Sequence, residues 1–338
     1  MRRGSIYLLV LCMVMGGLLF FSAFHTETYA APKILKISHQ WAKGDIRDLW
    51  AKKWIELVEQ KTNGSVKFRM YPAASLYKAK AQYDAMRKGG LDGCVLPFIY
   101  LSGKIPAYAI TSMPCLVKTA AQGTNWGKNE IGKRLEEIGI KSGFRTLSWG
   151  CIMGSIGSKK RPIIVPKDLK GFQVRGAGWA MEEVLRAGGA SITSMPSTEI
   201  YFALQTGALG ALTTTYSSFL SFRLYEVLDY LTISKGYGIF YAHHGILLSN
   251  KAWDRLTGDE QKAFMAAGKE VEPFMLEQAN GILDKCKKMY KDKGVKTHDL
   301  TEKAFNEWFE LAKKTAYKTY AKKVEKGEEL LGLALEVK

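Results

Sequence analysis

The chain has 338 residues, of which 47% are hydrophobic and 24% are charged. This composition is typical of a globular protein and excludes a disordered, collagen-like or coiled-coil chain. At roughly 150 residues per domain, the length predicts about two domains. Lys and Arg number 49 against 32 Asp and Glu, giving a formal net charge of +17. Because lysines and glutamates are mixed along segments such as 303–314, we expect a solvated basic surface and no nucleic-acid partner.

The first 30 residues have the layout of a secretory signal peptide. Arg2 and Arg3 precede an apolar run from residue 6 to residue 24, and small and polar residues follow up to Ala30. Cleavage after Ala30 releases an exported chain, so we predict a periplasmic location. The alternative is a membrane anchor that is retained, although its apolar length is borderline for a bilayer span.

The cysteine and histidine positions indicate no metal site and no cofactor. The cysteines after residue 30 match neither a zinc motif nor a C-x-x-C redox pair. Three of them lie in apolar, strand-like runs, which favours buried free thiols. His243 and His244 are adjacent, and adjacent residues of a strand point to opposite faces of the sheet. The four cysteines are Cys94, Cys115, Cys151 and Cys286.

The first part of the mature chain alternates strands with helices. Apolar residues at Leu49, Trp50 and Trp54 have helical spacing, and Gly64 follows the end of that helix. A strand–helix–strand–helix–strand order predicts a parallel α/β sheet. The predicted strands are 34–38, 66–71 and 91–96, and the predicted helices are 46–61 and 78–88.

A similar α/β pattern restarts after a Pro-flanked boundary at 159–166. Two such units with crossing connections suggest a two-lobed binding protein, whose ligand lies at the carboxyl ends of the strands. The predicted strands are 145–149, 172–175, 191–195, 211–215 and 237–248, the predicted helices are 180–187 and 198–206, and the tail from 257 to 326 is mostly helical with Pro273 and Gly294 as interruptions.

Four sequence blocks resemble one known family. Residues 166–175 read PKDLKGFQVR and residues 195–207 read MPSTEIYFALQTG. Both are similar to long blocks of the DctP-like solute receptors of TRAP transporters. Residues 85–92 (AMRKGGLD) and 248–256 (LSNKAWDRL) are similar to two shorter blocks of that family and keep its order.

The resemblance implies an α/β, periplasmic-binding-protein-like fold of type II character. Each lobe is expected to be a mixed sheet with flanking helices, with a long helix crossing both lobes and a helical C-terminal tail. Such receptors are monomers and deliver a small solute to a small and a large integral permease subunit, driven by an ion gradient. We expect a signal peptide at 1–30, lobe I at 31–155 plus about 245–275, lobe II at 156–244, and C-terminal helices at 276–338.

The family's carboxylate-binding arginine falls on Arg175, and a guanidinium matches a carboxylate with two parallel hydrogen bonds. The family's asparagine after the second block is replaced by Thr214, whose hydroxyl cannot reproduce the two-sided contact of an amide. We therefore expect a monocarboxylate with an apolar or aromatic body. Further expected ligand contacts are Gln40, Trp41, Phe98, Trp149, Trp179 and Tyr216, which lie in loops or at strand ends.

Two other functions remain open from the residues. The receptor could serve an ABC transporter or a sensor system, since a fold does not fix its function. An enzyme is the weaker hypothesis, because the chain has no G-x-S-x-G, Walker A or H-E-x-x-H motif.

Overall fold

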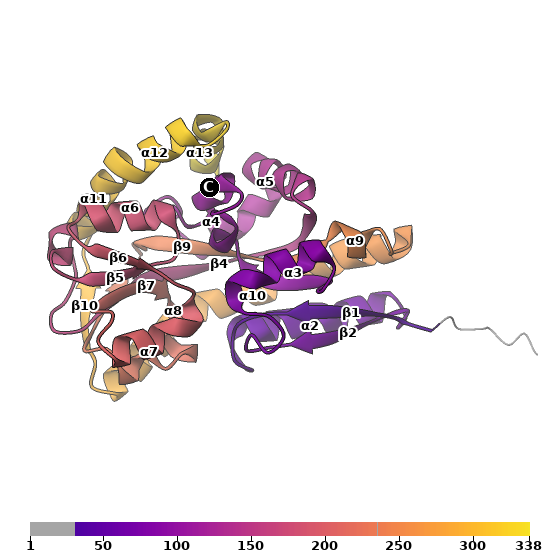
Figure 1. Ribbon diagram of the computed structural model, residues 1–338, viewed down its shortest axis with the longest axis horizontal. Helices are drawn as coiled ribbons and strands as arrows, with labels where there is room; N and C mark the ends of the chain where they lie inside the picture. Colours follow the sequence, from indigo (N-terminus) through magenta and orange to yellow (C-terminus); the bar gives the residue numbers. More distant parts are fainter. Residues whose placement is uncertain (1–30, 235) are drawn as a thin grey trace, which may run out of the picture. The chain divides into compact units, whose positions relative to one another are not determined.

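Strands from distant parts of the chain join in one mixed β-sheet (Figure 1). The computed structural model describes residues 31–234 and 236–338, so the predicted signal peptide lies outside the described residues. In chain order the strands are β1 (Lys33–Ser38), β2 (Val66–Tyr71), β3 (Gly93–Pro97), β4 (Phe144–Ser158), β5 (Gln173–Gly176), β6 (Ser191–Ser194), β7 (Ala211–Thr215), β8 (Tyr230–Ser234), β9 (Phe240–Ser249) and β10 (Lys296–Leu300).

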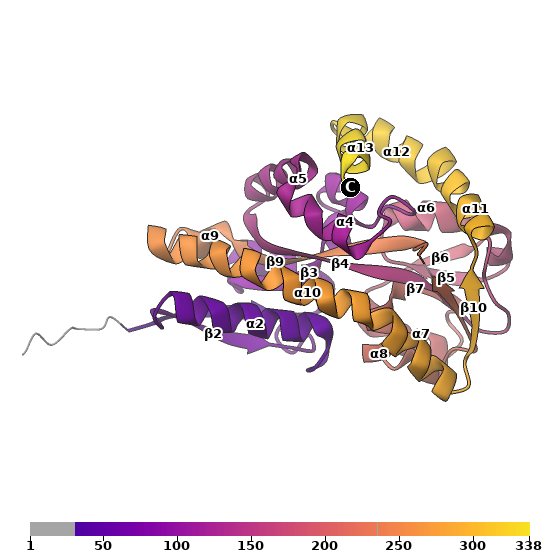
Figure 2. The same ribbon diagram turned by 180° about the vertical axis from the view of Figure 1, so that it is seen from behind.

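The helices flank this sheet on both faces (Figures 1 and 2). They are α2 (Ile46–Lys61), α3 (Gln82–Lys88), α4 (Ala120–Thr124), α5 (Glu130–Lys141), α6 (Trp179–Ala187), α7 (Ile200–Gln205), α8 (Tyr216–Ser221), α9 (Asn250–Trp253), α10 (Gly258–Asp292), α11 (Glu302–Ala312), α12 (Lys318–Lys323) and α13 (Gly327–Glu336). Short 3₁₀-helices include η2 (Phe98–Leu101), η3 (Pro106–Ser112) and η5 (Pro166–Leu169), and a π-helical turn at Lys313–Tyr317 joins α11 to α12.

The strand order runs β2-β1-β3-β9-β4-β7-β5-β6, with β8 paired to β4 and β10 paired to β8. The pairs β1–β3, β5–β6 and β5–β7 are parallel, as the alternating strands and helices predict. Strands β4 and β9 are antiparallel to each other and to their neighbours β7 and β3. The sheet is therefore mixed, and two long antiparallel strands connect its two parallel parts.

Strand β4 is longer than the predicted strand 145–149. Glycines at 150, 154 and 157 make the sequence look broken there, but each lies within the strand and faces a large side chain. A Cβ at Gly154 would lie 2.1 Å from the Phe240 ring, and one at Gly150 would lie 2.8 Å from Met275. These glycines thus permit close packing across the strand instead of ending it.

Helix α10 has 35 residues and continues through the exposed Pro273, which the sequence suggested as an interruption. Its first turn is fixed by a capping box, in which Thr257 and Glu260 bond each other's backbone N–H groups. Figure 2 shows α10 extending from α2 at one part of the sheet to α8 and β10 at the other. Neither α10 nor another helix of the described residues is long and apolar enough to cross a membrane.

The predicted helical tail contains one strand. Residues Lys296–Leu300 form β10, which pairs in parallel with β8. The following helices α11–α13 are tied to segments around the sheet through aromatic side chains: Trp308 Nε1 donates to Ile164 O, after β4, at 2.8 Å, and Tyr320 donates its hydroxyl to Ala107 O of η3 at 2.7 Å. The tail therefore contacts segments that follow β3 and β4 in the chain.

The four cysteines of the described residues are buried free thiols. Burial raises the pKa of the Cys94 thiol to about 12 and raises that of the other three as well. These side chains therefore act as small apolar core residues.

Gly268 provides a test of the contact between α10 and β4. A Cβ at this position would lie 1.7 Å from Leu147 O, whereas one at Gly281 of the same helix meets nothing within 4 Å. We expect Gly268→Ala to destabilise the protein by about 1–3 kcal/mol through overpacking. The control Gly281→Ala should stabilise it by about 0.5–1 kcal/mol through helix propensity. Urea unfolding measures both, and equal effects of the two variants would contradict this packing.

Candidate functional site

Strand ends and adjoining loops enclose a small cavity of about 30 Å³, called the central cavity below. The carboxyl ends of β1, β3, β5 and β7 contribute to it, together with the first turns of α2 and α8 and part of β9. Such a position is where open α/β sheets bind ligands. The wall consists of Gln40, Arg47, Pro97, Ile99, Tyr100, Ser112, Arg175, Ala177, Ser197, Thr214, Thr215, Ser218, Phe240, Ala242 and His244.

Arg175 brings a positive charge to this wall from strand β5. Its side chain is 1% exposed, with Nε donating to Met195 O at 3.0 Å and Nη1 donating to Thr213 O at 2.7 Å. Among the described residues no carboxylate lies within ion-pair distance of it. Burial lowers the pKa of Arg175, but a guanidinium starts so high that it stays charged. The wall therefore offers a fixed cation that two carbonyl dipoles hold in place.

Tyr100, Ser197 and Gln40 form a hydrogen-bonded cluster beside Arg175. The Tyr100 hydroxyl accepts from Ser197 N at 2.9 Å and donates to Ser197 Oγ at 3.3 Å. Gln40 Nε2 donates to Ser197 Oγ at 3.2 Å. These bonds join the loop after β1, helix η2 and the segment after β6 across the cavity, and they supply donors and acceptors that a polar ligand can use.

A second guanidinium, that of Arg47, enters the wall from the first turn of α2. Its Nε and Nη2 donate to the Asp45 carboxylate at 2.7 and 2.6 Å. On the other side, Nη1 donates to Ser218 Oγ at 3.1 Å. The guanidinium carbon lies 4.1 Å from the centre of the Trp41 ring. Arg47 is thus bound to its own carboxylate while it reaches across the cavity to α8.

Three buried histidines lie near the cavity, and burial lowers the pKa of each. His244 lines the wall, where the charge of Arg47 lowers its pKa further. His39 contacts Asp48, and His243 lies between the carbonyl oxygens of Thr111 and Gly123. Within residues 31–234 and 236–338 no three or more His, Cys, Asp or Glu side chains are grouped to hold a metal ion.

Three of the sequence-predicted ligand residues meet in the central cavity, namely Gln40, Arg175 and Thr214. A fourth, Trp41, is fully buried behind Arg47 and stacks near His39 with ring centres 6.0 Å apart. Its ring contacts the Arg47 guanidinium and is not part of the cavity wall.

The remaining four predicted residues lie outside the cavity wall, because other packing contacts use their rings. Phe98 and Trp149 pack on each other with ring centres 4.6 Å apart. Trp179 stacks on Tyr320 of α12. Tyr216 is buried, with its hydroxyl donating to Thr232 O and accepting from Ser234 N.

Several wall residues are not recognisable as site residues from the sequence. Arg47 and its partner Asp45 carry no motif, since an Asp before a helix is an ordinary N-cap. Ser197 and Ser218 are small hydroxyl residues whose only signal was their position beside the predicted strands 191–195 and 211–215. His244 was considered only for metal binding.

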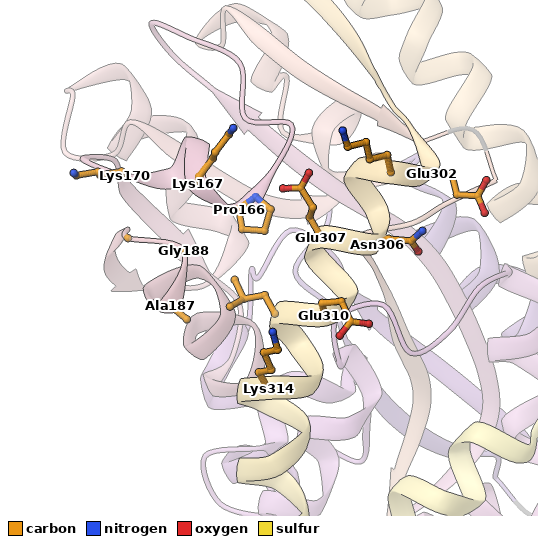
Figure 3. A pocket seen from close by; sticks show the side chains of 13 residues that line it. Pro166, Lys167, Lys170, Ala187, Gly188, Glu302, Asn306, Glu307, Glu310 and Lys314 are labelled. Carbon is orange, nitrogen blue, oxygen red and sulfur yellow. The ribbon is translucent and has the colours of Figure 1, made fainter.

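A wider surface hollow of about 1180 Å³ lies between η5, the end of α6 and helix α11 (Figure 3). Figure 3 shows Lys167 and Lys170 on one side and Glu307, Glu310 and Lys314 on α11. Exposed side chains of both signs line it, without the convergent buried polar groups of the central cavity. The central cavity is therefore the better candidate for solute binding.

Comparison with known proteins agrees with this architecture. The family model DctP, bacterial extracellular solute-binding protein family 7, matches residues 37–323. A solute-binding protein of Albidiferax ferrireducens is 35% identical over 325 residues, covering 95% of this chain and 96% of its own. A TRAP periplasmic solute-binding protein of Rhodoferax ferrireducens, solved with bound malonate, is 36% identical with a TM-score of 0.87, covering 90% of this chain and 98% of its own. This chain belongs to the DctP family of TRAP solute-binding proteins.

Membership of the DctP family confirms the predicted fold class, and it identifies a solute-binding protein instead of an enzyme. More distant members share the fold. A Desulfovibrio salexigens protein with bound orotic acid has a TM-score of 0.84 at 24% identity, covering 90% of this chain and 97% of its own. The C4-dicarboxylate-binding periplasmic protein DctP of Rhodobacter capsulatus is 26% identical over 310 residues, covering 89% of this chain and 91% of its own.

The buried histidines predict how stability depends on pH. The pKa of His243 is lowered from 6.5 to about 4, so the unfolded chain binds a proton there that the folded chain does not. Its contribution is complete above pH 6.5 and is lost as the pH falls towards about 4.

We expect His243→Gln, which keeps a donor for the carbonyl oxygens, to flatten this fall. The slope of the unfolding free energy should decrease by up to about 1.4 kcal/mol per pH unit. Chemical denaturation of wild type and variant at several pH values measures it, and identical slopes would show that His243 does not titrate in this way.

Proposed function

We propose that this protein is an extracytoplasmic receptor that captures a small carboxylate and delivers it to a TRAP permease. The observation that carries the proposal is the buried guanidinium of Arg175, which faces the central cavity without a carboxylate partner among the described residues. A buried charge is costly unless it is paired. An organic anion in the cavity supplies that pair through charge-assisted hydrogen bonds.

The ligands of related proteins support a carboxylate. The Rhodoferax ferrireducens relative holds malonate, the Desulfovibrio salexigens protein holds orotic acid, and a Sulfurospirillum deleyianum protein of 23% identity holds succinate. These ligands share a carboxyl group and differ in the remainder of the molecule. We therefore propose that this protein also recognises the carboxyl group of its solute.

We further propose a monocarboxylate with a short apolar body. The apolar side chains of the wall are Pro97, Ile99, Ala177, Phe240 and Ala242, and they lie beside Gln40, Arg47, His244 and the hydroxyl groups around Arg175. Thr214 offers one hydroxyl in place of the amide of other family members. Because the cavity is small, we favour a solute body of a few carbon atoms over one that contains an aromatic ring.

Capture requires the cavity to open. A volume of about 30 Å³ has room for only about two or three water molecules. We propose a hinge motion between lobe I (31–155 plus about 245–275) and lobe II (156–244), with the helices of 276–338 packed on both. The bonds from Gln40 to Ser197 and from Arg47 to Ser218 then join the lobes in the closed state.

Family membership supports the remaining parts of the proposal. TRAP receptors act with a small and a large integral subunit, and periplasmic relatives support a periplasmic location after removal of residues 1–30. Membership of the DctP family also favours an ion-driven permease over an ABC transporter or a sensor system as the partner of this receptor. It likewise favours a monomer as the working form. Neighbouring genes for the two permease subunits are the direct check.

Arg175→Gln tests the carboxylate anchor. We expect carboxylate affinity to fall about 30-fold or more, since truncating one partner of a buried charge pair costs about 2–5 kcal/mol. Thermal shifts of refolded protein with a panel of carboxylates, the corresponding amides and neutral sugars provide the measurement. Carboxylates alone should stabilise the wild type.

Arg186→Gln is the matched control, because Arg186 is an exposed residue of α6. Circular dichroism of all variants separates lost binding from lost folding. If Arg175→Gln is folded and still responds to carboxylates, or if sugars stabilise the wild type, the carboxylate anchor at Arg175 is wrong.

A further inference from the structure

The two guanidinium groups of the central cavity differ in one respect: Arg47 has its own carboxylate and Arg175 does not. We propose that the buried Asp45–Arg47 pair determines the charge of the solute. Asp45 neutralises Arg47, which leaves Arg175 as the uncompensated cation and restricts capture to acids with a single negative charge. This inference rests on the proposed function, since it assumes that a carboxylate binds at Arg175.

The geometry of the pair holds Arg47 in place from three sides. Both nitrogens on one edge of the guanidinium donate to Asp45, and both side chains are 1% exposed. Trp41 covers one face, and Ser218 accepts from the third nitrogen. Because both side chains are almost fully buried, bulk solvent screens the pair little, and the carboxylate offsets the charge of Arg47.

The other titratable groups near the cavity do not change this balance. The pKa of His244 is well below its usual value, because burial and Arg47 disfavour its charged form. Asp48 is held by Lys52 Nζ at 2.7 Å and by Gly44 N at 2.8 Å. Glu182 acts on Arg175 electrostatically but forms no ion pair with it. Glu182 lies outside the wall, so the charges of Arg47 and Arg175, which line the cavity, and of Asp45, which pairs with Arg47, sum to +1.

A solute with two carboxylates meets a different environment at its second group. That carboxylate would lose its water and compete with Asp45 for the guanidinium of Arg47. A buried charge without a partner is strongly unfavourable. The same cavity accepts an uncharged amide at this position, since Ser218 and Thr215 can exchange hydrogen bonds with it.

Asp45 also caps helix α2, and the test must separate this structural role from its proposed effect on the charge of the solute. It is the N-cap of α2, and its Oδ1 accepts from Arg47 N at 2.9 Å. Asn caps helices about as well as Asp does. Asp45→Asn therefore removes the negative charge and keeps the cap, so a purely structural role predicts an unchanged solute preference.

The experiment compares malonate with malonamate, its monoamide, and succinate with succinamate. The two members of each pair have nearly the same shape and differ by one charge at neutral pH. Isothermal titration of the mature chain gives the affinity ratio of monoanion to dianion. The variants are Asp45→Asn, Arg47→Gln and the double variant, which give the wall charges of +2, 0 and +1.

We expect wild type to prefer the monoanion of a pair by at least about tenfold. Asp45→Asn should shift the ratio by at least about tenfold towards the dianion, and the double variant should return it to the wild-type preference. Arg47→Gln leaves Asp45 without its cation, so we expect weaker binding of both probes. If Asp45→Asn does not fold, recovery of monoanion binding from Arg47→Gln to the double variant tests the same charge rule.

The outcomes separate this inference from the proposed function. A wild-type protein that binds no carboxylate overturns both. A wild type that binds carboxylates but prefers the dianion, or a ratio that Asp45→Asn leaves unchanged, overturns the charge rule alone. A double variant that binds monoanions as weakly as Arg47→Gln overturns it as well.

Discussion

The burial of the Arg175 guanidinium is the constraint on which the site depends. A positive charge that is 1% exposed cannot be stabilised by bulk water, so the protein must surround it with dipoles or pair it with an anion. The carbonyl groups of Met195 and Thr213 supply the dipoles, and both belong to segments that neighbour β5 in the sheet. The sheet topology therefore creates the polar environment of the charge, beside the cavity in which we propose that the carboxylate binds.

The antiparallel strands β4 and β9 make this arrangement possible. They connect the two parallel parts of the sheet, so the strand ends that carry Gln40 and Arg175 face one cavity although the residues are far apart in sequence. Helix α10 packs along β4, with Gly268 in direct contact with the strand backbone. The sheet is thus continuous on one side of the cavity, and the contacts across the cavity include hydrogen bonds between polar side chains.

Much of the fold could be predicted from the sequence, because short-range patterns determine it. Helix α2 has the predicted bounds, and β7 occupies the predicted residues 211–215. The errors arose where distant contacts override local signals: the glycines of β4 fit against side chains from other elements, and β10 is a strand because β8 is its partner.

Arg175 was found through a long family motif. The Asp45–Arg47 pair was not, since its position in the cavity depends on Ser218, 171 residues from Arg47. Trp149 and Trp179 show the converse, because an aromatic residue at a predicted strand or helix end looks the same in sequence whether it lines the central cavity or packs elsewhere.

The four buried thiols have a consequence for the biogenesis of an exported chain. The thiolate is the form that oxidants attack, and burial suppresses it by raising the pKa of each cysteine in the folded protein. The unfolded chain lacks this protection, and an oxidising compartment promotes disulfides between thiols that the native fold keeps reduced. With the periplasmic location that we propose, folding and oxidation of these thiols compete. Burial of Cys94 and Cys151 within the sheet withdraws both thiols from that competition.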